Sequence, residues 1–131
     1  MTLFMLDTDS VSFALRGHGR VAEVLARRAP SEVCVSAISA AELRFGAAKR
    51  GSRKIHAALR SFFAAVQVMP FDSSAADQFG EVAAALSGAG APIGQMDTLI
   101  ASHALSLGAT LVSNNQKHFS KVPGLKLDNW V

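Results

Sequence analysis

The sequence lacks the features that mark an oxidised or membrane-bound protein. Cys34 is the only cysteine among 131 residues, so no disulfide can form within the chain and a reducing compartment fits. No apolar run approaches the roughly 18 residues that span a membrane. The first apolar run is too short for a signal peptide and has no basic segment before it. We therefore expect a soluble, cytoplasmic protein in which Cys34 is a buried, inert thiol.

Acidic residues are missing from a long segment in the middle of the chain. Residues 43–71 contain no Asp or Glu. The basic residues of that segment are Arg44, Lys49, Arg50, Arg53, Lys54 and Arg60. Taken alone, such a run is typical of a solvated helix face. Beside a cluster of carboxylates it favours a phosphodiester substrate, in keeping with a formal net charge of +3.

The chain also lacks linkers, repeats and low-complexity segments, and half of it is hydrophobic, which predicts one domain with one core. Short apolar runs predict strands at residues 3–6, 33–36, 66–69, 110–113 and 125–127. Helices are expected at about residues 11–16, 20–29, 40–49, 53–65, 74–86 and 97–107, with Asp9 or Ser10 capping the first. Strands that alternate with helices predict an α/β fold with a parallel sheet covered on both faces.

Three carboxylates lie at the ends of these predicted elements. Asp7 closes the first strand, and Glu42 and Asp97 are expected to open helices. An unpaired charge is costly at the edge of a hydrophobic element, and carboxylates that meet repel one another. A hard divalent ion with oxygen ligands, such as Mg²⁺ or Mn²⁺, would offset that repulsion.

The topology gives a reason for these acids to meet. Ligands of open parallel sheets bind at the carboxyl ends of the strands, where Asp7 and Asn115 are both expected. Asp97 precedes Ile100 and Ala104 by three and seven residues, so it shares their apolar helix face and points toward the sheet. Together these positions favour a metal site.

Each acid also has an ordinary structural explanation. Asp7 suits a turn at the end of a strand, and Asp97 suits the first turn of a helix, where negative charge is favourable. Glu42 follows Ser39 by three residues, which is the spacing of a capping box.

Several segments together carry a resemblance to a known family. They are residues 4–9, 36–46, 90–101, 111–115 and 119–125, with Trp130 near the end of the chain. No single motif is specific, but in their order and spacing they resemble PIN-domain ribonucleases, in particular the VapC toxins of bacterial toxin–antitoxin pairs. The match runs essentially from end to end.

The resemblance implies a three-layer α/β/α fold with a central parallel sheet, in a single PIN-like domain over residues 1–131. It implies Mg²⁺-dependent endonuclease activity on RNA, with Mn²⁺ as a substitute. Asp7 and Asp97 would bind the metal, and Glu42 and Asn115 would complete the catalytic site. In-line attack of water on the phosphodiester would then depend on metal electrostatics and positioning.

The resemblance also implies a substrate and partners. Similar toxins cut initiator tRNA in its anticodon loop, so tRNA is the expected substrate. Arg44, Lys49 and Arg50 are the candidates for contacts with the RNA backbone. A VapB-like antitoxin and a toxin homodimer are expected, with the helical pair over residues 40–65 supplying much of the antitoxin contact.

The chain departs from the family pattern at three positions. Asp9 occurs where the family usually has Asn, and His118 replaces a common Glu. Asn115 occurs where several relatives carry a fourth Asp. A neutral amide adds no charge, so one well-occupied divalent ion is expected, with a weak or substrate-assisted second.

Two other functions are compatible with parts of the sequence. The run from Asp7 to Val11 resembles the first motif of haloacid-dehalogenase-like phosphatases, but those enzymes also need a later lysine and a paired-acid loop, and Asp97 has no acidic neighbour. The acids could instead be structural in a module that binds nucleic acid or protein without catalysis. Metal-dependent RNA cleavage separates the nuclease from this second alternative.

Overall fold

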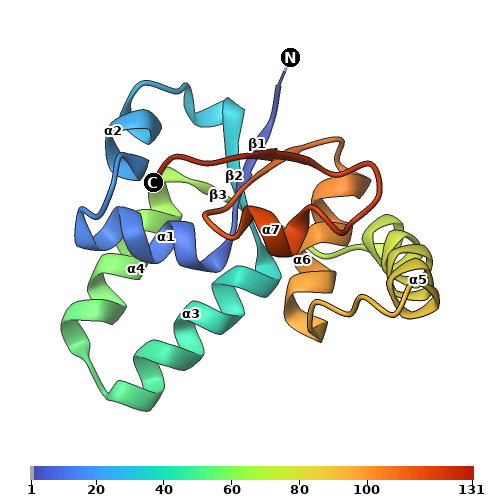
Figure 1. Cartoon of the computed structure of the whole chain (residues 1–131). Coiled ribbons are helices and arrows are strands. Elements are labelled where there is room, and N and C mark those ends of the chain that lie inside the picture. Colours follow the sequence, from blue (N-terminus) through green and yellow to red (C-terminus); the bar gives the residue numbers. More distant parts are fainter. Residues whose placement is uncertain (1) are drawn as a thin grey trace.

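A single parallel sheet organises the protein, whose computed structural model describes residues 2–131 (Figure 1). Its strands are β1 (Phe4–Leu6), β2 (Val33–Ser36), β3 (Gln67–Met69), β4 (Thr110–Val112) and β5 (Lys126–Asp128). They lie in the order β3-β2-β1-β4-β5, and every neighbouring pair is parallel. The predicted parallel sheet is therefore confirmed, and all five predicted strands are present.

Helices connect the strands and cover both faces of the sheet. They are α1 (Thr8–Arg16), α2 (Val21–Ala26), α3 (Ala37–Arg50), α4 (Arg53–Ala65), α5 (Ser73–Gly88), α6 (Gln95–Ser106) and α7 (Gln116–Phe119), with a 3-10 turn at Pro30–Glu32. The sequence patterns missed α7 and the 3-10 turn, because each is too short to show a helical period. Within residues 2–131, no helix has both the length and the hydropathy needed to cross a membrane.

The alternation of side chains along each strand creates two cores. Phe4 and Leu6 face one side of the sheet, where they pack with residues of α1, α2 and α4. Met5 faces the other side and packs with residues of α5 and α6. Figure 1 shows these two groups of helices on opposite sides of the strands. This is the expected three-layer α/β/α arrangement.

Two helix starts differ from the predicted ones. Helix α3 follows β2 without a loop, because the Ser36 hydroxyl caps it by accepting a hydrogen bond from the backbone N–H of Ile38 at 3.0 Å. The expectation that Glu42 opens its helix is therefore wrong, and so is the alternative explanation of Glu42 as part of a capping box with Ser39. Helix α1 is capped by Asp7 and not by Asp9 or Ser10.

The strand order creates a crevice at one point of the sheet. The chain runs outward from β1 to β2 and β3, and then returns to the opposite side of β1 to form β4 and β5. Ligands of such sheets bind beyond the strand ends at this reversal, which here lies between β1 and β4. The two strand ends are tied together, since the backbone N–H of Asp7 donates to the Val112 carbonyl at 3.0 Å.

Candidate active site

Asp7 lies at the end of β1, in the crevice between β1 and β4. Its side chain caps α1 by accepting a hydrogen bond from the backbone N–H of Ser10 at 2.8 Å. Only 6% of the residue is exposed, and this burial raises the pKa of its carboxyl above the usual range, although hydrogen bonds from Ser113 and Ser10 act in the opposite direction. A cation beside Asp7 would therefore stabilise its ionised form.

Asp97 lies in the first turn of α6, as predicted, and its side chain is 38% exposed. Burial is again the largest effect and raises the pKa of its carboxyl, while the nearby His118 lowers it. The charge of Asp9 raises the pKa of both Asp7 and Asp97, so Asp9 lies within electrostatic reach of both. The structure thus brings two acids from distant parts of the chain, together with Asp9, to one end of the sheet.

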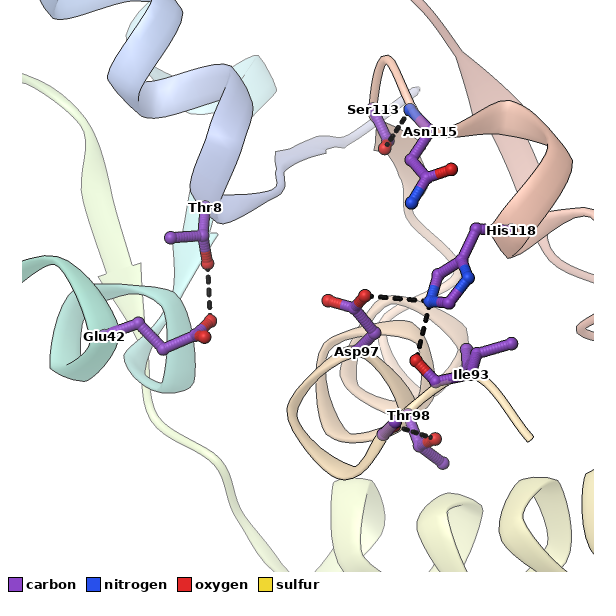
Figure 2. Close-up of polar contacts among 9 residues, drawn as sticks. Thr8, Glu42, Ile93, Asp97, Thr98, Ser113, Asn115 and His118 are labelled. Carbon is purple, nitrogen blue, oxygen red and sulfur yellow. Dashed lines mark hydrogen bonds and ion pairs between the residues drawn. The ribbon is translucent and has the colours of Figure 1, made fainter.

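Glu42 reaches the same region from α3, where it is the sixth residue of the helix. Its Oε1 accepts a hydrogen bond from the hydroxyl of Thr8 at 2.7 Å (Figure 2). Because Thr8 directly follows Asp7, this bond joins the first turn of α1 to α3 beside the crevice. Thr8 was not singled out from the sequence, although a hydroxyl next to an acid at the end of a strand is a signal that could have identified it.

Asn115 follows β4 at the predicted edge and is the residue before α7. It is exposed, and its backbone N–H donates to the Ser113 hydroxyl at 2.9 Å. Figure 2 shows its side-chain amide pointing toward Asp97 and His118. Asn115 therefore contributes a neutral polar group to the region of Asp97.

The donor set of the site fits a hydrated Mg²⁺ better than a closed protein cage. Among residues 2–131, no three His, Cys, Asp or Glu side chains lie close enough together to form a metal-binding group. Mg²⁺ does not require such a group, because it usually keeps several waters and is held by one or two carboxylates. Asp7 and Asp97 would supply hard oxygen ligands, and a bound cation would offset the cost of burying each carboxylate, which raises its pKa.

A groove of about 420 Å³ extends from the acidic crevice between α1, α3 and α4. Asp9 and Glu42 line it together with two basic residues, Arg16 and Arg50. Of the three predicted RNA contacts, only Arg50 lines this groove. Arg44 instead lies over the ring of Phe63, and Lys49 lies near the ring of Phe45.

The fold and the site together define a class of protein. The protein is a doubly wound α/β protein with one buried and one half-buried carboxylate near its topological reversal, an arrangement that suits a divalent cation. Comparison with known proteins narrows this class to a family.

The sequence model of the PIN domain matches residues 4–125. The chain is 32% identical over 131 residues to the tRNA(fMet)-specific endonuclease VapC of Salmonella typhimurium, covering 99% of each chain. It is 38% identical over 135 residues to ribonuclease VapC2 of Haemophilus influenzae, covering all of both chains.

The DNA-bound VapBC structure from Salmonella typhimurium superposes with a TM-score of 0.92 at 32% identity over the full length of both chains. VapBC2 from Rickettsia felis, bound to a promoter DNA fragment, superposes with a TM-score of 0.87 at 33% identity, covering 99% of this chain and 100% of that one.

This chain belongs to the PIN-domain family of metal-dependent nucleases, within its VapC group. The resemblance seen in the sequence is confirmed, and the phosphatase alternative is set aside because the family assignment covers nearly the whole chain.

Proposed function

We propose that this protein is the toxin of a toxin–antitoxin pair and that it cleaves RNA with Mg²⁺ as its cofactor. The proposed substrate is tRNA, with the anticodon loop of initiator tRNA as the best candidate, since the Salmonella typhimurium relative is named for tRNA(fMet). The observation that carries the proposal is that Asp7 and Asp97 both lie within electrostatic reach of Asp9 at one end of the sheet, each with a pKa raised by burial. Two such carboxylates are a poor choice for a purely structural role.

Each residue of the site would have a separate role in hydrolysis. Asp7 and Asp97 would hold the ion, and Glu42, oriented by Thr8, would accept a proton from the attacking water. A bound Mg²⁺ supplies a more acidic water and offsets the charge that develops on the phosphate. Arg50, in the groove beside Glu42, would bind the RNA backbone.

A VapB-like antitoxin is the proposed partner, with the toxin forming a homodimer inside the complex in the cytoplasm. The structural relatives include VapBC complexes from two organisms. On the helical pair of α3 and α4, Phe45 is 67% exposed, whereas Leu59 and Phe62 are buried in the core. The antitoxin contact is therefore assigned to Phe45, Ile55 and Phe63 and not to the whole apolar face.

Antitoxin binding should protect α3 and α4 from hydrogen exchange. The toxin would be measured alone and with the product of the small gene expected immediately upstream, with α5 as the internal control because it packs on the opposite face of the sheet. Protection is expected to rise over residues 40–65 and to stay constant in α5. If the complex forms but exchange over residues 40–65 does not change, the assigned surface is wrong.

Replacing Asn115 by Asp is expected to tighten a second Mn²⁺ site. The wild-type site has few charges with which to offset the repulsion between two ions, which in paired-metal sites lie about 3.5–4 Å apart. Calorimetry on the RNA-free protein should give one well-occupied site for the wild type and a stronger second site for the variant. Two equally tight Mn²⁺ sites in the wild type would refute the single-ion expectation.

Direct assay of RNA cleavage tests the proposed function. Purified protein is incubated with total RNA in Mg²⁺, with an EDTA control, and the new ends are mapped. New ends that require Mg²⁺ and cluster in a tRNA anticodon loop are expected. Ends that form equally in EDTA would contradict the metal-dependent mechanism, and ends confined to other RNAs would contradict the tRNA assignment alone.

A further inference from the structure

The proposed mechanism gives no role to His118, which contacts one of the proposed metal ligands. His118 lies on α7, and its Nε2 is 3.0 Å from Oδ2 of Asp97 and 2.6 Å from the carbonyl oxygen of Ile93 (Figure 2). A carbonyl oxygen can only accept a hydrogen bond, so the Nε2 atom of His118 carries a hydrogen whether the ring is neutral or charged. That N–H is therefore shared between the backbone carbonyl and the Asp97 carboxylate.

The imidazole ring is held in place from both ends of its short helix. The Gln116 side chain donates hydrogen bonds to the carbonyls of Ser113 at 2.8 Å and Asp128 at 3.1 Å, which fixes α7 to the ends of β4 and β5. Phe119 is buried and meets the His118 ring edge-on, with centroids 5.6 Å apart. The donor that contacts Asp97 is therefore held by its neighbours on both sides, although the Asp97 side chain is 38% exposed.

The Ile93 contact gives this donor a second function. Ile93 directly precedes Gly94, which is the N-cap of α6, so the bond to Ile93 joins the start of α6 to α7 at the sheet edge. The same His118 nitrogen contacts Asp97, the third residue of α6. One nitrogen atom, Nε2 of His118, thus contacts both the backbone just before α6 and the Asp97 side chain in its first turn.

We infer that His118 is a positioning residue that orients the Asp97 carboxylate for the metal. The inference rests on the proposed function, because it needs Asp97 to be a ligand. His118 contacts Oδ2, so Oδ1 of Asp97 is available to the ion. A ligand held in its binding orientation loses less side-chain freedom when the ion binds, and partners of this kind orient ligands in many metal sites.

Two amide variants separate this role from a general structural one. His118→Gln places an amide N–H near the position of the imidazole Nε2, whereas His118→Asn has the same chemistry but is too short to reach Asp97. Calorimetry with Mn²⁺ on the RNA-free protein should show affinity lowered by about 10–100-fold in His118→Asn and largely retained in His118→Gln. His18→Asn is the matched control, since His18 also packs against a phenylalanine ring, that of Phe13, but has no contact with Asp97.

The outcomes distinguish this inference from the proposed function. Unchanged Mn²⁺ affinity in His118→Asn would overturn the positioning role, as would an equal loss in both amide variants accompanied by an equal loss of thermal stability. In an Asp97→Asn background, His118→Asn should cause no further loss of Mn²⁺ affinity, because the group it orients is already altered. If the wild-type protein cleaves RNA but His118→Asn binds Mn²⁺ equally tightly, the inference alone is overturned. If the wild-type protein neither binds Mn²⁺ nor cleaves RNA, the proposed function itself is overturned.

Discussion

Replacing Asp97 by Asn is expected to nearly abolish RNA cleavage, with a loss on the order of 10²–10³-fold, because metal stabilisation of the transition state contributes several kcal/mol. The amide keeps the shape of the side chain and can still accept a hydrogen bond from His118. Folding should survive, since burial disfavours the charged form of Asp97, as its raised pKa indicates, and the amide is uncharged. The measurement is the initial rate of Mg²⁺-dependent cleavage, with thermal melting to verify the fold.

The matched control for this variant is Asp77→Asn on α5, an exposed acid on the opposite side of the sheet from α1. It removes the same charge from the protein and should leave cleavage unchanged. Full Mg²⁺-dependent activity in folded Asp97→Asn protein would contradict the assignment of Asp97 as a metal ligand.

Replacing Asp7 should abolish cleavage to a similar degree, but its effect on stability should depend on the new residue. Asp7 both faces the crevice and caps α1. Asn can keep the cap and Ala cannot, so Asp7→Ala should be less stable than Asp7→Asn by about 1 kcal/mol. Chemical denaturation of both variants measures this difference, and equal stabilities would show that the cap contributes nothing.

The stability difference between wild type and Asp7→Asn should also depend on pH. The pKa of Asp7 is raised in the folded state, so the folded protein binds a proton more readily than the unfolded chain does. The corresponding stabilisation is present at low pH and is lost as the pH rises from the ordinary pKa of an aspartate, 3.8, through the raised pKa of Asp7. Metal-free Asp7→Asn should therefore be at least as stable as wild type at neutral pH, and this advantage should disappear in acid. An advantage that grows as the pH falls would contradict the raised pKa.

The sequence predicted the elements of the fold better than their arrangement. The run from Phe4 to Leu6 is apolar and buried on both faces, so it was recognisable as a strand of a covered parallel sheet. The reversal of strand order between β1 and β4 could not be read from local patterns, because pairing depends on contacts more than a hundred residues apart. The start of α3 was missed because Ser36 both ends β2 and caps the helix, whereas Ser39 offered an equally plausible cap.

The sequence predicted where the acids of the candidate site lie, but it did not predict which residues contact and orient them. The positions of Asp7 and Asp97 follow from strand ends and helix faces, which have clear sequence signals. The contact of Glu42 with Thr8 depends on how α1 packs against α3, and the contact of Asp97 with His118 depends on where the short helix α7 lies, and no spacing in the sequence encodes either. The family resemblance supplied what the periodicity lacked, since it placed these acids in one site.

The most direct test of the central claim is to locate the metal in crystals of the RNA-free protein soaked with Mn²⁺, using anomalous scattering. One strong peak is expected between β1 and β4, within coordination distance of carboxylate oxygens of both Asp7 and Asp97. The same soak of Asp97→Asn crystals should give a much weaker peak. A strong peak elsewhere, or no peak at these acids in protein that cleaves RNA with Mn²⁺, would contradict the proposed site.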